Sequence, residues 1–153
     1  MDVEIRKAVK TDAEGILALI HELAVFEKEP EAVIVTKTEI EQDGFGDRPL
    51  FECIVAEVAE KVVGMALFYP RYSTWKGPTF HLEDLIVTES MKGKGIGTKL
   101  YKAFLSHADS LGVDRVEWVV LDWNTTAIQF YEKSGAKVLS DWNIVQMDRS
   151  SIK

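Results

Sequence analysis

The chain has 153 residues, 46% of them hydrophobic, so it can bury one good core and is expected to form a single domain over residues 1–153. The net charge of −7 and a pI near 5.0 argue against nucleic-acid binding, although an acidic protein attracts cationic substrates. No apolar run approaches membrane-spanning length, and the first ten residues lack the apolar segment of a signal peptide. We therefore expect a cytoplasmic protein with no membrane partner.

The cysteine and histidine content gives no metal-binding pattern. Cys53 is the only cysteine, which excludes an internal disulfide, and its place in an alternating apolar run predicts a small core residue. The histidines, His21, His81 and His107, lie far apart without the spacing of metal ligands. We therefore predict no metal site.

The first part of the chain predicts a short strand and a helix. Val3–Ala8 reads as the strand, and Thr11 with Glu14 forms a capping box that would begin the helix. The helix should end before Pro30. Its apolar positions recur at helical spacing and predict a buried stripe, made of Ile16, Leu19, Ile20, Leu23 and Phe26.

A second helix and two paired strands are predicted next. Thr36 and Glu39 form another capping box, which would begin a short helix that stops near Gly44. The apolar runs Leu50–Val58 and Lys61–Tyr69 are separated by two residues only. They are therefore expected to be adjacent antiparallel strands.

The central segment reads as a strand, a glycine loop and a helix. The strand Phe80–Val87 leads to glycines at three alternate positions, Gly93, Gly95 and Gly97. The following helix would bury the apolar residues Ile96, Leu100, Phe104 and Leu111. Glycines let consecutive N–H groups close around phosphate oxygens at a helix N-terminus, and Lys92, Lys94 and Lys99 add positive charge. The spacing fits neither a Walker loop nor a dinucleotide fingerprint, and a glycine turn without a ligand is the alternative.

The last part of the chain predicts further strands and one helix. After Gly112, the run Val113–Leu121 reads as a buried strand, and Asn124 would cap a helix that Gly135 ends. Val138–Leu139 and Asn143–Met147 would be closing strands. This order of elements predicts an α/β domain with a largely antiparallel sheet.

Two groups of residues could carry chemistry. Glu83 and Asp84 are adjacent in an apolar strand, where carboxylates are costly to bury, but strand neighbours point to opposite faces unless the strand is bent. A solvent-exposed strand end is the alternative.

Tyr131 follows Asn124 by seven residues, two helical turns, so the two share one face. A core tyrosine and a plain helix cap are the alternatives for that pair.

The glycine loop also carries a family resemblance. Lys92-x-x-Gly95-x-Gly97 resembles the pyrophosphate loop of the GCN5-related N-acetyltransferases, the GNAT superfamily, which hold acetyl-coenzyme A there. Lys92 departs from that pattern, which has Arg or Gln. The segments HELAVFE, DGFG, HLEDLIV, GKGIGTKL, DWN and FYEKSGA resemble the diamine (spermidine/spermine) acetyltransferases over most of the chain.

The resemblance implies a fold and an activity. The GNAT fold is a mixed, mostly antiparallel twisted sheet of about six to seven strands with about four flanking helices. The implied activity is acetyl-coenzyme A-dependent transfer to a primary amine of a small cationic substrate, a diamine or polyamine, by direct attack in a ternary complex. A homodimer is also implied.

The resemblance also implies roles for individual residues. Glu83 is expected to be the base, acting through water, and Tyr131 the acid that protonates the departing sulfur. Asp84, Glu27 and Phe26 are expected to line the acceptor site, although a solvated helix end is the alternative for the last two. The residues expected to bind acetyl-coenzyme A are Leu85, Ile86, Val87, Lys92, Gly93, Lys94, Gly95, Ile96, Gly97, Thr98, Asn124 and Tyr131.

The acceptor itself stays open at this point. Ser73 falls where the polyamine enzymes carry another acid, so a shorter amine or an amino acid with a side-chain amine, such as thialysine, competes with the polyamines. A peptide N-acetyltransferase would share the cofactor loop. A non-catalytic acyl-coenzyme A-binding module would keep the loop but would need neither Glu83 nor Tyr131.

Overall fold

The computed structural model describes residues 1–153 and divides into two compact units, Met1–Val119 and Val120–Lys153. The first unit is built on a five-stranded sheet in the order β1-β2-β3-β4-β5. Its first three pairings are antiparallel and the β4–β5 pairing is parallel, so the sheet is mixed and mostly antiparallel as predicted, with fewer strands. The strands are β1 Glu4–Lys7, β2 Glu52–Val58, β3 Lys61–Ser73, β4 Gly77–Val87 and β5 Val116–Glu117.

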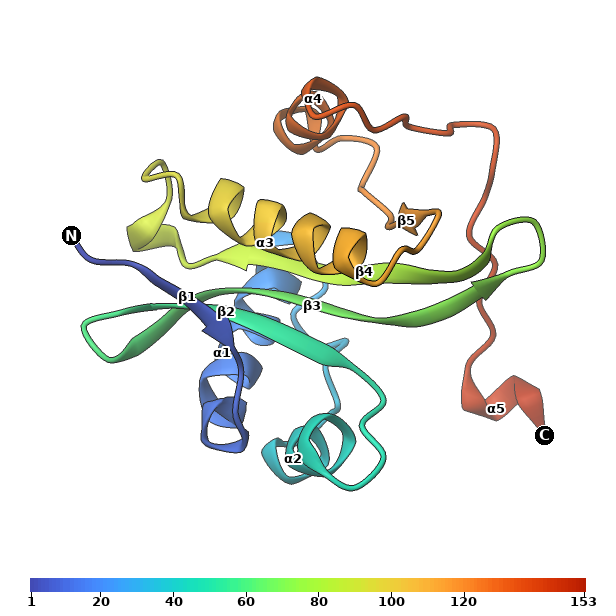
Figure 1. The fold of residues 1–153 in the computed structure, drawn as a ribbon. Helices are drawn as coiled ribbons and strands as arrows, with labels where there is room; N and C mark the ends of the chain where they lie inside the picture. The colour runs from blue at the N-terminus through green and yellow to red at the C-terminus, as the bar shows by residue number, and fades with distance from the viewer. The chain divides into compact units, whose positions relative to one another are not determined.

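Helices cover both faces of this sheet. The helices α1 (Ala13–Phe26) and α2 (Lys37–Phe45) lie on one face, and α3 (Ile96–Ser110) lies on the other (Figure 1). Each face has its own apolar cluster, one around Ile16 and Met65 and one around Phe68 and Phe104. The α/β class predicted from the sequence is confirmed.

The helical stripes are as predicted except at their ends: Phe26, predicted in the α1 stripe, is 44% exposed, and Leu111 also fails. Ile16 and Leu19 of α1 are buried, and so are Ile96, Leu100 and Phe104 of α3, which lie three or four residues apart. Leu111 does not belong to the α3 stripe. It follows the last helical residue and is 58% exposed, because the helix ends at Ser110, before its next turn.

One of the two predicted capping boxes is present. The Thr36 side chain accepts a hydrogen bond from the Glu39 N–H, and Glu39 accepts one from the Thr36 N–H, at the start of α2. The box at Thr11 is wrong, because α1 begins two residues later, after a short 3₁₀ turn. The Asp12 carboxylate accepts from the Val9 N–H and from Arg6, 2.8 Å away, and this ion pair ties the turn to the sheet.

The predicted strand after α3 is mostly absent. Of Val113–Leu121, only Val116 and Glu117 pair with β4, opposite Phe80 and His81. Beyond Glu117 the chain has no sheet neighbour, and Val119 is 60% exposed. The prediction followed apolar content alone, whereas a strand needs a partner for its hydrogen bonds.

The second unit contains α4 (Thr125–Lys133) and the short α5 (Arg149–Ile152). Asn124 caps α4 as predicted, with its side-chain oxygen accepting from the Ala127 N–H at 3.3 Å. Gly135 follows the helix with a φ of +103°, a value that glycine adopts without strain. The closing strands predicted at 138–139 and 143–147 are wrong: neither segment pairs with a strand, and Leu139, Ile144, Val145 and Met147 are exposed.

Cys53 is a core residue, as its alternating context predicted. It is 4% exposed and packs in the cluster under α1, where burial raises the pKa of its thiol. A thiol held in its neutral form is a poor nucleophile. None of the helices has the length and apolarity needed to cross a bilayer.

Candidate active site

A bulge in β4 brings the two adjacent carboxylates to one face of the sheet. Leu67 of β3 pairs with Asp84 and Phe68 pairs with Leu82, so Glu83 is the extra residue. Such a bulge breaks the alternation of a strand. Phe80 and Leu82 before it, and Leu85 and Val87 after it, all pack in the α3 cluster. Glu83 and Asp84 are therefore both left on the opposite face, the α1 face.

Glu27 joins these two carboxylates from the end of α1. It is the residue that follows the last turn of α1, and partial burial, followed by the charge of Glu83, raises its pKa. Burial, followed by the charges of Glu83 and Glu27, raises the pKa of Asp84 to about 7. The three side chains therefore form one electrostatically coupled group, defined here as the acid trio. Such a group favours a bound cation.

A hydrogen bond from Tyr69 fixes the orientation of Glu83, and the His81 ring lies near the same carboxylate. The Tyr69 hydroxyl donates to Glu83 Oε1 at 2.9 Å, and burial together with this bond raises the pKa of Tyr69 to about 12. His81 Nε2 lies 3.9 Å from the same oxygen, and Arg71 Nη1 lies 3.1 Å from His81 Nδ1. Because a guanidinium can only donate, His81 Nδ1 accepts and the ring proton is on Nε2, towards Glu83. Burial lowers the pKa of His81, which favours this neutral form.

The loop after β4 has the geometry of an anion cradle. Gly93 and Gly95 have φ values of +77° and +80°, and no atom lies within 4 Å of where a Cβ would stand on either. Packing within the protein therefore does not explain these glycines, whereas the positive φ does. Gly95 precedes α3, a helix of 15 residues, whose first N–H groups have no helical partner. The space and the donors fit the diphosphate of a coenzyme A molecule.

Contacts from α1 hold this loop. Glu22 accepts from the Thr88 hydroxyl at 2.9 Å and from the Glu89 N–H at 2.9 Å, at the point where the chain leaves β4. One turn further along α1, the Phe26 ring lies under Lys92 Nζ, 5.1 Å from its centroid. The same helix therefore supports the glycine loop and ends at Glu27 of the acid trio.

The second half of β4 has a free edge. Leu85, Ile86 and Val87 pair with β3 on one side, whereas β5 reaches β4 only at Phe80 and His81. The other edge of residues 85–87 is thus open to an extended ligand, as strand addition requires. It lies between the acid trio and the glycine loop.

The two remaining predicted residues belong to the second unit. Asn124 uses its side chain to cap α4, and Tyr131 is on the same helix, with its ring centroid 5.6 Å from that of Phe130. The first unit thus brings together the predicted site residues that lie on α1, on β4, in the glycine loop and at the start of α3. The roles of Asn124 and Tyr131 stay predictions.

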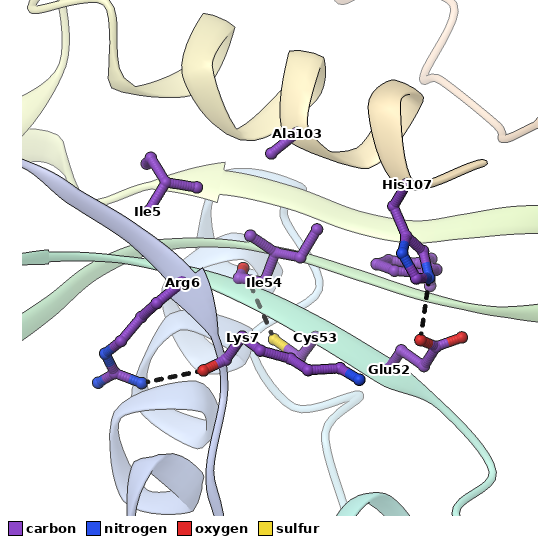
Figure 2. A pocket seen from close by; sticks show the side chains of 9 residues that line it. Ile5, Arg6, Lys7, Glu52, Cys53, Ile54, Ala103 and His107 are labelled. Carbon is purple, nitrogen blue, oxygen red and sulfur yellow. Dashed lines mark hydrogen bonds and ion pairs between the residues drawn. The ribbon is translucent and has the colours of Figure 1, made fainter. Parts of the chain in front are cut away.

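A cavity of about 330 Å³ lies apart from these residues. It is lined by residues of β1, β2, β3 and α3, and His107 Nε2 lies 3.1 Å from Glu52 Oε1 at one end (Figure 2). None of the predicted site residues lines it. The cavity therefore plays no part in the candidate active site.

Sequence reasoning missed Tyr69, His81 and Glu22. His81 stands next to the acidic pair, but a lone histidine in a strand carries no signal of its partner Arg71, ten residues away. Tyr69 and Glu83 are 14 residues apart and meet only through strand pairing. Glu22 lies within a resembling segment, HELAVFE, which was the one available pointer to it.

Comparison with known proteins agrees with the sequence resemblance. The Acetyltransferase (GNAT) family model matches residues 16–136. A thialysine N-epsilon-acetyltransferase from Bos taurus is 36% identical over 99% of this chain and 95% of its own length. The human spermidine/spermine N(1)-acetyltransferase-like protein 1 is 35% identical over 97% of this chain, which matches 23% of that longer protein.

Solved structures show the same fold. An integron cassette protein from the mobile metagenome of V. cholerae superposes with a TM-score of 0.80 at 24% identity, covering 99% of this chain and 96% of that one. At this identity the likeness concerns the fold alone. The α/β arrangement of sheet and helices is therefore one that experiment has already found in another protein.

Proposed function

The chain belongs to the acetyltransferase (GNAT) family and is an N-acetyltransferase, and from this premise we propose that it acetylates a primary amine of a small cationic substrate with acetyl-coenzyme A. The observation that carries the proposal is the acid trio. Three coupled carboxylates face one side of the sheet, and the strand that holds two of them leads directly into the glycine loop. We also propose that residues 1–153 act as one acetyltransferase domain.

The predicted site residues of the first unit have proposed tasks in binding the cofactor and the acceptor. The N–H groups of Gly93 to Thr98, with Lys92 and Lys94, would hold the diphosphate, and the open edge of Leu85, Ile86 and Val87 would hold the extended arm of the cofactor. Acetyl-coenzyme A supplies an activated acetyl thioester. Phe26 and Glu27 would form one wall of the acceptor site, and Asp84 would contact the ammonium group.

Proton movement is assigned to Glu83 and Tyr131. An alkyl amine is an ammonium ion at neutral pH, because its pKa is near 10, and it must lose a proton before it can attack. Tyr69 occupies Oε1 of Glu83, which leaves Oε2 to take that proton through a water molecule. The Tyr131 hydroxyl would give its proton to the departing sulfur, and Asn124 would contact the cofactor. An N–H group at residues 85–87 would stabilise the negative charge on the carbonyl oxygen.

The test is a thiol-release assay with a panel of diamines, polyamines, amino acids with side-chain amines, and peptides. We expect turnover with the small amines, and Glu83→Gln should lower it most at low pH while leaving acetyl-coenzyme A affinity nearly intact. Unchanged rates across pH would remove Glu83 from its role. Binding of acetyl-coenzyme A without turnover of any acceptor would favour the non-catalytic module, and turnover of peptides alone would favour a peptide acetyltransferase.

We also propose a cytoplasmic homodimer. Within the second unit several apolar side chains are exposed, including Val145 at 92% and Trp142 at 70%, and a second copy of the chain could bury apolar surface of this kind. Light scattering during gel filtration measures the mass in solution. A mass of one chain at micromolar concentration would contradict the dimer.

A further inference from the structure

A row of side chains on β3 connects the acid trio to a site of opposite charge. Tyr69, Arg71 and Ser73 are alternate residues of β3 and point to one face. Tyr69 donates a hydrogen bond to Glu83. Arg71 is two residues further along β3, a distance of about 6.7 Å between the two Cα atoms in a strand. The guanidinium of Arg71 and the carboxylate of Glu83 contact opposite nitrogens of His81. The spacing of about 6.7 Å along the strand between Tyr69 and Arg71 is comparable to the length of an extended lysine side chain.

The Arg71 guanidinium is only partly occupied. Its Nη1 contacts His81 Nδ1 at 3.1 Å and Glu117 Oε1 at 3.0 Å, and both contacts use this one nitrogen. The Nε and Nη2 atoms carry no contact, and the side chain is 54% exposed. Glu117, on β5, is itself 31% exposed. A cation and an anion therefore stand side by side, each with room for a further partner.

The end of this row carries no acid. The Ser73 hydroxyl accepts from the N–H groups of Trp75 and Lys76 at 3.1 Å each, and Arg115 Nη1 lies 3.5 Å from it. A second arginine thus stands near the end of the row. A long polycation that extended from Glu83 along β3 would meet two guanidinium groups, which like-charge repulsion disfavours.

We infer that Arg71 and Glu117 recognise the head group of an α-amino acid whose side-chain amine is acetylated. The free edge of the Arg71 guanidinium binds the α-carboxylate through two parallel N–H donors, and Glu117 binds the α-ammonium. The side chain then extends along β3 towards Glu83. This inference rests on the proposed function, because it takes the acid trio as the place where the reacting amine lies.

The experiment compares three acceptors with the same five-carbon amine chain. L-Lysine has both head groups, 1,5-diaminopentane lacks the carboxylate, and 6-aminohexanoate lacks the α-ammonium. We measure kcat/KM for each with acetyl-coenzyme A in the wild type, Arg71→Gln and Glu117→Gln. Arg48→Gln removes an exposed arginine elsewhere on the surface and serves as the control for net charge.

The expected pattern is selective. Arg71→Gln should lower the lysine-to-diaminopentane ratio of kcat/KM by about tenfold or more, the usual effect of losing a charged hydrogen bond. Glu117→Gln should lower the lysine-to-aminohexanoate ratio, and Arg48→Gln should change neither. Ratios that stay unchanged in Arg71→Gln, while all three amines are acetylated, would overturn this inference alone. Acetylation of a polyamine but of none of these three would overturn this inference alone, whereas acetylation of no small amine in the wider panel would overturn the proposed function and this inference with it.

Discussion

Replacing Asp84 with asparagine should stabilise the protein at alkaline pH. In the folded chain the pKa of Asp84 rises from 3.8 to about 7, first because the side chain is buried and then because Glu83 and Glu27 are negative. Each unit of pKa corresponds to about 1.4 kcal/mol. The raised pKa therefore costs the folded state up to about 4 kcal/mol above pH 7, and Asp84→Asn removes that cost.

The sign of the pH dependence follows from the raised value. Well below pH 3.8 the carboxyl is protonated in the folded and unfolded states alike, and it costs nothing. As the pH rises towards 7, the unfolded chain releases the proton while the folded chain keeps it, so stability falls. The advantage of Asp84→Asn should thus be about 1 to 2 kcal/mol at pH 5 and approach 4 kcal/mol at pH 8.

The assay is urea denaturation of the wild type and the variant at pH 5 and pH 8. Asp47→Asn is the matched control, since it makes the same chemical change at an exposed position and should leave the free energy of unfolding within about 0.5 kcal/mol. A variant that is less stable than the wild type at pH 8 would refute the reasoning, and so would a gain that is equal at both pH values.

Two other predictions concern the proton path. Tyr131→Phe should lower turnover by about ten-fold or more with little change in acetyl-coenzyme A affinity, measured by thiol release and calorimetry, and a fully active variant would rule out the assignment. Gln at position 81 can present an amide N–H near the place of Nε2, whereas Asn reaches only the place of Nδ1, so His81→Gln should keep more of kcat than His81→Asn. Equal losses in the two variants would show that the N–H directed at Glu83 does not matter.

Local signals in the sequence predicted local structure well. The capping box at Thr36 and Glu39 depends on residues three apart, and it is present. The glycine loop also depends on neighbouring residues, and Gly93 and Gly95 have the positive φ values that such a loop needs. At Thr11 the same kind of signal failed, because a 3₁₀ turn precedes α1 there and Asp12 pairs with Arg6 of the strand before it, an ion pair that the capping pattern does not include.

Signals from apolar content predicted strands less reliably. Two segments have the composition of strands, Val113–Leu121 and Asn143–Met147. In the first segment only two residues are paired with the sheet, and in the second segment none are. A helix makes its hydrogen bonds within its own segment, whereas a strand depends on a neighbour that composition does not identify. The same reason explains why the contact of Tyr69 with Glu83 was missed.

The bulge at Glu83 is the one irregularity on which the candidate site depends. With regular alternation, Asp84 would share a face with Phe80 and Leu82 and would lie in the apolar cluster under α3. The extra residue moves Asp84 to the side of Glu83 and Glu27, and it returns Leu85 to the α3 cluster. One inserted residue therefore keeps the core apolar on both sides of the bulge and gathers the carboxylates on the other face. The raised pKa of Asp84, caused first by burial and then by the charges of Glu83 and Glu27, measures what this position costs the fold, which is why a stabilising substitution there should be the one that weakens amine binding.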